Sequence, residues 1–441
     1  MTPMNSSVGR FNKVRIQKTG SVLDIDAEAT SFPGQVIGTR TSRSQREGWA
    51  IVLGLAVVLC IIFGTTLNSI SVFTLSITSA FQCSNEQASR VATAFMFTMT
   101  LAMPLAGWLL DRVSPRPVMT VGALIAALGY LLASQSADID QLTFAIAISG
   151  IGVGTSTYVP AITIATRWIA FDRQGLAFGI LLAGSSTGAV IFPMLLTDII
   201  AVIGWRNTMQ VVAGIIGLLC IPILLWAART PESQSIANYQ LATQLEGHGI
   251  CQAMRMPRYW LWIAMQLLLL LSSIGVFIAL VPYLVSTGYS AEHAAAFLAG
   301  TAVAALIGNF AFGMLSDRWG AKAILLIGTV FGVAGIFFLL AASDPVLGVG
   351  AITLFSLIWG STFNLVNQFA PLLLVEAVGQ RNFGSLLGIG NLIAGMGSAF
   401  SPTAVGYLVD VTHTYTVALL LCAALAVAAL IPIALQRSTS S

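Results

Sequence analysis

Residues 313–322 read GMLSDRWGAK, and residues 107–116 read GWLLDRVSPR. Both stretches have the form G-x-L-x-D-R followed by a turn and a basic residue, and both lie between two long apolar segments. They begin 206 residues apart, which is close to half of the 441-residue chain. The spacing predicts two copies of one membrane unit, with the charged turn at the same place in each.

The composition is that of a membrane protein. Hydrophobic residues make up 56% of the chain and charged residues only 8%. Apolar runs of about 18 residues or more, long enough to cross a bilayer, recur along the sequence. We expect an all-α membrane protein with twelve transmembrane helices in two six-helix bundles. The predicted spans are 49–78, 87–110, 117–135, 142–168, 174–198, 206–227, 259–285, 291–313, 321–342, 346–370, 383–407 and 414–435.

The polar stretches between these spans divide the chain. We expect residues 1–48 to form a disordered cytosolic tail, because they are basic and rich in Ser, Thr and Gly. Residues 228–258 are the one long interior linker, and we expect it to be cytosolic. The linker separates an N-terminal bundle at 49–227 from a C-terminal bundle at 259–437.

The Lys and Arg residues predict the orientation. If the N-terminus is inside, 18 of the 20 lie on the inner side, and only Arg90 and Arg206 lie outside. Such an excess marks the cytoplasmic face of a membrane protein. We therefore expect a multi-pass protein of the plasma (inner) membrane with both termini in the cytosol.

The paired charged turns resemble the loop signature of the major facilitator superfamily, which joins helices 2 and 3 and again helices 8 and 9. The resemblance covers about residues 47–437 and implies a transporter that works by alternating access. Glu47-Gly48-Trp49 and the stretch 176–184, LAFGILLAG, are most similar to the monocarboxylate and oxalate–formate carrier branch. The resemblance implies a secondary active transporter for a small organic acid, either a monocarboxylate or an aromatic acid, and leaves coupling to protons open.

We expect each charged turn to act as a latch. The glycine lets helices approach closely, and the aspartate can pair with an arginine or accept hydrogen bonds from a helix N-terminus. Such a cluster could hold the two halves together on one membrane face and release when they rock. The alternative is ordinary positive-inside charge at a helix end. The predicted gating residues are Gly107, Asp111, Arg112, Arg116, Gly313, Asp317, Arg318 and Lys322.

The sequence departs from the carboxylate-carrier branch at the residues that would bind the acid. In that branch, span 8 usually carries an arginine four residues before the glycine of the charged turn, and this chain has Asn309 there. Span 11 lacks the lysine of the oxalate–formate carriers, and Asn391 is the strongly polar side chain in its middle. A carrier or exporter of neutral or lipophilic molecules is therefore the alternative function.

Neutral polar side chains gather on spans 1, 4, 7 and 10, the cavity-lining set of the superfamily. An amide that faced lipid would be costly, so we expect each to face the cavity or another helix. Hydrogen bonding between helices is the alternative for each amide, and packing is the alternative for the two aromatic residues. The predicted substrate-binding residues are Asn68, Ser71, Tyr158, Gln266, Asn309, Trp359, Asn364, Asn367, Gln368 and Asn391.

The sequence offers little for other classes of function. The five cysteines and three histidines have no metal-ligand spacing, and there is no ATP-binding motif. We find no nucleophile–base pair and no basic patch with interleaved aromatic residues. We therefore expect a protein that is not an enzyme, binds no metal, cofactor or nucleic acid, and acts as a monomer on a small-molecule substrate in a lipid bilayer.

Overall fold

The computed structural model describes residues 42–83, 85–230, 249–344 and 348–436. Every regular element in these ranges is a helix. Eleven stretches are long and apolar enough to cross a membrane. One of them, Phe171–Ala227, has 57 residues and turns back at Gly204, so it contains two of the predicted spans. The all-α fold predicted from the sequence is confirmed.

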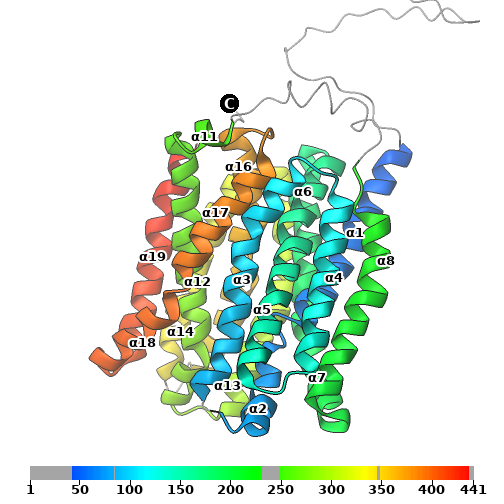
Figure 1. Ribbon diagram of the computed structural model, residues 1–441. Coiled ribbons are helices and arrows are strands. Elements are labelled where there is room, and N and C mark those ends of the chain that lie inside the picture. Colours follow the sequence, from blue (N-terminus) through cyan, green and yellow to red (C-terminus); the bar gives the residue numbers. More distant parts are fainter. Residues whose placement is uncertain (1–41, 84, 231–248, 345–347, 437–441) are drawn as a thin grey trace, which may run out of the picture. The chain divides into compact units, whose positions relative to one another are not determined.

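The first half of the chain forms the helices α1 to α8 (Figure 1). Their bounds are α1 Ser42–Thr65, α2 Ile70–Phe81, α3 Asn85–Leu110, α4 Pro115–Ser134, α5 Ile139–Ser156, α6 Tyr158–Trp168, α7 Gln174–Ile215 and α8 Ile221–Ala227. Helix α1 begins seven residues before the predicted start at 49, so residues 42–48 belong to the helix. Most of the predicted tail, residues 1–41, lies outside the described residues.

The second half follows a linker of which residues 231–248 lie outside the described part. Its helices are α11 Ile250–Ala253, α12 Pro257–Ser286, α13 Ala291–Trp319, α14 Ala321–Leu340, α15 Gly348–Thr362, α16 Leu365–Val378, α17 Phe383–Ser398, α18 Ser401–Thr412 and α19 Tyr415–Leu435. The short α11 falls within the predicted linker.

Several predicted single spans are broken helices in the structure. The first span is interrupted between Thr65 and Ile70, the fourth at Thr157, and the tenth between Thr362 and Leu365. In the first break, the backbone N–H of Asn68 donates to the carbonyl of Phe63 at 2.9 Å, five residues earlier, instead of to the carbonyl four residues earlier as in a regular helix. Discontinuous helices of this kind commonly form the solute sites of transporters.

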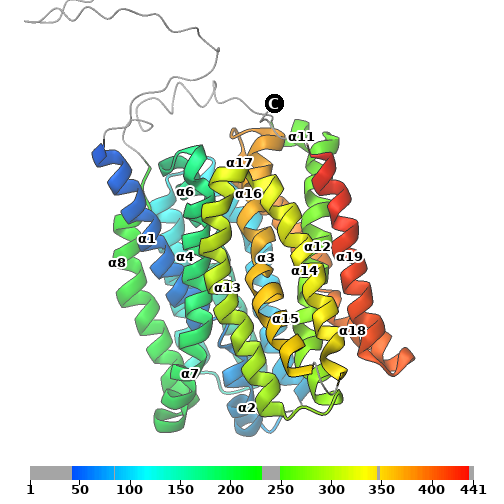
Figure 2. The same ribbon diagram turned by 180° about the vertical axis from the view of Figure 1, so that it is seen from behind.

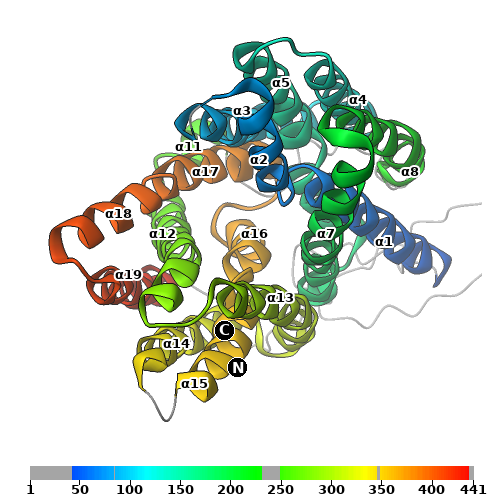
Figure 3. The same ribbon diagram turned by 90° about the horizontal axis from the view of Figure 1, so that it is seen from below.

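The two halves meet along two pairs of helices, α3 with α17 and α7 with α13, which we call the two seams (Figures 2 and 3). Both charged turns lie at the same end of the molecule, near the start of α1 (Figure 1). We call this the charged end. The predicted repeat therefore places its two turns where the halves touch.

Gly204 sets the reversal inside α7. Its φ is +79° and its ψ is 161°, a conformation open almost only to glycine. No heavy atom lies within 4 Å of the position that a Cβ would take, so only the backbone conformation opposes a side chain.

We predict that Gly204→Ala lowers the free energy of unfolding by about 1–3 kcal/mol, because alanine is strained at this φ. Gly214→Ala is the matched control: it lies in the same helix, at ordinary helical φ and with free space around it, and should be neutral or stabilising. Thermal unfolding of the two variants in detergent gives the comparison. Equal melting temperatures would contradict the assigned cause.

Candidate functional site

Asp111 connects the end of α3 to the start of α17. Its Oδ2 accepts hydrogen bonds from the backbone N–H of Ser385 at 2.9 Å and from the Ser385 hydroxyl at 2.6 Å. Its Oδ1 accepts from the N–H of Gly384 at 3.2 Å. The first N–H groups of a helix have no partner within the helix and carry partial positive charge. The aspartate of the first half therefore caps a helix of the second half.

Burial raises the pKa of Asp111 above its ordinary value. The hydrogen bonds from Ser385 and Gly384, together with the positive charge of Arg167, act in the opposite direction. Arg167 itself donates to the carbonyl of Leu110 at 3.0 Å, one residue before the aspartate. The hydrogen bonds and the arginine thus offset only part of the cost of burying this charge.

Asp317 makes the equivalent contact in the other direction. It lies in the last turn of α13, and its two carboxylate oxygens accept from the N–H of Leu176 at 3.2 and 3.4 Å. Leu176 lies in the first turn of α7. Each half therefore contributes one carboxylate and one helix N-terminus, and we call these two contacts the latches.

Glycines allow this approach. A Cβ on Gly107 would lie 1.9 Å from the carbonyl oxygen of Gly384, and one on Gly313 would lie 2.8 Å from that of Gly175. Distances below about 3 Å are not tolerated without movement of the backbone. Close packing of the two seams therefore requires glycine at both turns.

None of the contacts described for the four basic residues of the charged turns crosses between the two halves. The Arg112 guanidinium lies over the ring of Trp108, 4.1 Å from its centroid. Arg116 and Arg318 are exposed. Lys322 donates to the carbonyls of Ala434 and Gln436 at the end of α19, within its own half. Of the eight predicted gating residues, the structure brings the two aspartates and the two glycines to the seams.

Three of the predicted binding residues join at the α7–α13 seam. The amide groups of Asn309 and Asn364 both donate to the hydroxyl of Ser186, at 3.1 and 3.2 Å. Gln368 donates to the carbonyls of Gly175 and Asn309, at 3.2 and 3.0 Å. We call Ser186, Asn309, Asn364 and Gln368 the amide cluster. It links α7 of the first half to α13 and α16 of the second.

The other predicted binding residues lie apart from this cluster. Gln266 of α12 donates to Asn391 of α17, inside the second half. The Tyr158 hydroxyl donates to the carbonyl of Asn367 at 2.5 Å and so connects the two halves. Asn68 lies in the break between α1 and α2. The side chain of Ser71 lies outside the described part of the structure.

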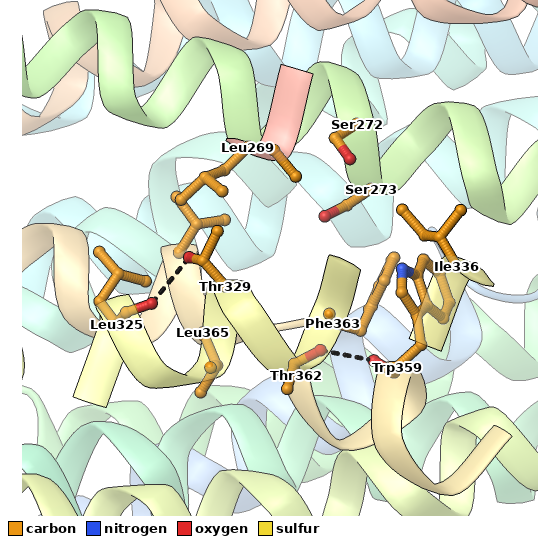
Figure 4. A pocket seen from close by; sticks show the side chains of 14 residues that line it. Leu269, Ser272, Ser273, Leu325, Thr329, Ile336, Trp359, Thr362, Phe363 and Leu365 are labelled. Atoms are coloured by element: carbon orange, nitrogen blue, oxygen red, sulfur yellow. Dashed lines mark hydrogen bonds between the residues drawn. The ribbon is translucent and has the colours of Figure 1, made fainter. Parts of the chain in front are cut away.

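Trp359 lines a cavity inside the second half, between α12, α14, α15, α16 and α19 (Figure 4). The cavity has a volume of about 40 Å³. Ser272 and Ser273 also line it, and sequence reasoning missed both. The sequence feature that could have identified them is the pair of adjacent serines within the apolar run 267–278. Sequence reasoning also missed Ser186 and Ser385.

A metal site is not found in the described part of the chain, where no three His, Cys, Asp or Glu side chains lie close enough to hold an ion. All five cysteines lie in the described part of the chain, and none of them forms a disulfide bond there.

A protein-family model and individual relatives of known name were compared with this sequence, and they agree with one another. The family model described as Major Facilitator Superfamily matches residues 54–377, well over half of the chain. Mouse monocarboxylate transporter 12 is 26% identical over 405 residues, which cover 85% of this chain and 82% of the relative. Rat monocarboxylate transporter 13 is 27% identical over 377 residues and covers 84% of each chain.

A bacterial relative and two solved structures extend the comparison. The Bacillus subtilis protein described as an uncharacterized MFS-type transporter, YcxA, is 24% identical and covers 86% of this chain and 92% of its own length. The crystal structure of FucP in the outward conformation superposes with a TM-score of 0.67 at 18% identity, over 89% of this chain and 100% of that one. A second structure, of the E. coli fucose:proton symporter FucP, gives a TM-score of 0.68 at 17% identity, over 90% and 100%.

We predict that Asp111→Asn and Asp317→Asn each weaken the charged end. The replacement places an amide N–H₂ against the N–H donors, and a hydrogen bond to a charged group contributes about 1.5–3 kcal/mol. The exchange rate of the first-turn amides of α17 or α7, respectively, should rise about tenfold or more. Asp111→Asn should have the larger effect, because Asp111 accepts from three groups and Asp317 from the N–H of Leu176.

Hydrogen exchange read by mass spectrometry measures both helix starts directly. Asp140→Asn, an exposed carboxylate in the first turn of α5, serves as the control and should leave them unchanged. Wild-type exchange in both seam variants would exclude the latches.

Proposed function

The chain belongs to the Major Facilitator Superfamily, and from that premise we propose that this membrane transporter carries small organic acids by alternating access. An acid substrate is supported by the similarity to proteins named monocarboxylate transporters, which extends over 84–85% of the chain. Other members of the superfamily carry other solutes, so membership of the superfamily alone does not define the substrate class.

In the proposed cycle, the two halves move relative to each other at the seams. With both latches and the amide cluster formed, the charged end is closed, and solute would enter from the opposite end. Rocking of the halves would break the contacts of Asp111 and Asp317 and open the charged end. The contacts to be broken are a few charge-assisted hydrogen bonds. The free energy needed to break them can come from a solute that binds the open conformation more tightly than the closed one.

We further propose that the charged end faces the cytosol of the plasma or inner membrane. In the described residues, Arg112, Arg116, Arg318, Lys322 and their neighbours lie at this end, and Arg90 and Arg206 lie toward the other. The positive-inside rule favours this orientation and cytosolic termini. One chain contains both halves and both seams, so a monomer suffices for the proposed cycle.

Uncharged or lipophilic solutes are the second candidate. Asn309 stands where the carboxylate carriers have arginine, is fully buried, and donates its amide hydrogen bond to Ser186. No fixed positive charge is therefore offered to an anion at this position. An ionised acid buried beside Asn309 without a counter-charge would be costly, and this cost favours uncharged solutes.

We predict that proteoliposomes containing the protein exchange a labelled monocarboxylate or aromatic acid by counterflow, and that an inside-alkaline pH gradient stimulates uptake. Neutral aromatic solutes and protein-free vesicles are measured in parallel. Exchange of neutral solutes alone would replace the organic-acid proposal by the second candidate.

We predict that Asn309→Ala changes the turnover of exchange more than the apparent affinity for solute, because Asn309 bonds to the opposite half. Losing one neutral hydrogen bond should change the maximal rate by roughly two- to tenfold. Thr353→Ala, an exposed hydroxyl on α15, is the control. A change confined to apparent affinity would instead assign Asn309 to solute binding.

A further inference from the structure

An open groove runs along the α3–α17 seam at the charged end, where α11 also packs against α17 (Figure 1). Its volume is about 390 Å³, which lies within the range of small-molecule sites. Leu105 and Trp108 are 49% and 41% exposed, so the groove opens to the surroundings of the protein. We call it the seam groove. Its lining residues are Pro104, Leu105 and Trp108 of α3, Ile250 of α11, and Ser385 and Ile389 of α17.

The seam groove lies at the ends of two membrane spans. Its α3 residues belong to the last two turns of the candidate span Gln87–Leu110, and its α17 residues belong to the first two turns of Phe383–Thr412. Tryptophan is enriched at this depth, because its ring is apolar and its N–H is polar. An apolar groove that is open at this depth faces lipid. An acyl chain in the groove would continue to a headgroup at the membrane surface.

A positive charge lies at the rim of the groove. The guanidinium of Arg112 lies over the ring of Trp108, 4.1 Å from its centroid. Arg112 is exposed, and it makes no ion pair or side-chain hydrogen bond with any described residue. A guanidinium matches a phosphate group with two parallel hydrogen bonds, and stacking on a ring leaves the N–H groups at its edge available.

The other charges at this end also favour an anionic headgroup. The neighbouring carboxylate, Asp111, already accepts hydrogen bonds from Gly384 and Ser385. Arg255 and Arg258, between α11 and the first turn of α12, are exposed and basic. Basic residues at the membrane surface attract anionic lipids, which are enriched in the cytoplasmic leaflet. This is the side that we propose for the charged end.

We propose that the seam groove binds one anionic phospholipid, with an acyl chain along Pro104, Leu105 and Ile389 and the phosphate at Arg112. Because α3 and α17 belong to different halves, the groove exists only while the two halves are in contact at this seam. A bound lipid therefore favours the closed charged end and shifts the population toward it. This effect does not depend on which solute is carried.

Photolabelling locates the lipid. The full-length protein in detergent is mixed with phosphatidylglycerol that has a photoactivatable acyl chain, and light should attach it to the segments around Leu105 and Ile389. Unlabelled phosphatidylglycerol should compete about fivefold or more better than phosphatidylcholine with the same chains, the factor expected for one basic residue at a membrane surface. Glycerol phosphate, which has a phosphate but no chains, should not compete.

Variants assign the labelling to the groove. Arg112→Gln should remove the preference for phosphatidylglycerol. Trp108→Ala should weaken labelling, and Trp108→Phe should restore most of it, because the ring under the guanidinium is kept. Arg318→Gln, at the equivalent exposed arginine of the second charged turn, is the control and should label like the unchanged protein.

Hydrogen exchange measures the effect on the seam. In liposomes that contain phosphatidylglycerol, the first-turn amides of α17 should exchange about fivefold or more slowly than in phosphatidylcholine alone. Arg112→Gln should show no such difference, and Arg318→Gln should keep it.

Three photolabelling results would overturn the proposal: labelling confined to other helices, equal competition by phosphatidylcholine or glycerol phosphate, or an unchanged lipid preference in Arg112→Gln. Exchange at α17 that is the same with both lipids would also overturn it.

Discussion

A carboxylate can lie in a protein interior only where hydrogen-bond donors surround it, and in this chain those donors belong to the opposite half. Asp111 accepts from the first turn of α17, and Asp317 accepts from the first turn of α7. Each contact uses backbone N–H groups that the helix leaves without an internal partner. The glycines at both turns are required because the helices must come close enough for these bonds to form.

The two seams differ in the hydrogen bonds that hold them together. At the α3–α17 seam, Asp111 accepts three hydrogen bonds and has Arg167 nearby. At the α7–α13 seam, Asp317 accepts from the N–H of Leu176, and the amide cluster adds further bonds. That cluster is incomplete, because Asn309 Oδ1 and Gln368 Oε1 are buried without a partner among the described residues. Each unpartnered acceptor costs about 1–3 kcal/mol, which favours a seam that can open.

The helices and the repeat could be predicted from the sequence, because apolar runs and the repeated turn are local patterns. The breaks near Thr65, Thr157 and Phe363 were not, because Ser, Thr and Asn occur in both intact and broken membrane helices. Contacts between distant residues were harder still. The sequence contains Ser185 and Ser186 side by side, and only the structure shows that Ser186 receives two amide groups from the other half.

The central claim is that the halves are held together at the charged end and separate there during transport. Spin labels on Val113 of the first half and Gln380 of the second, both exposed, would measure that separation in liposomes by electron–electron resonance. We expect a short distance and a longer one, with the proportions shifting when solute is added. A single distance that solute does not change would contradict the claim.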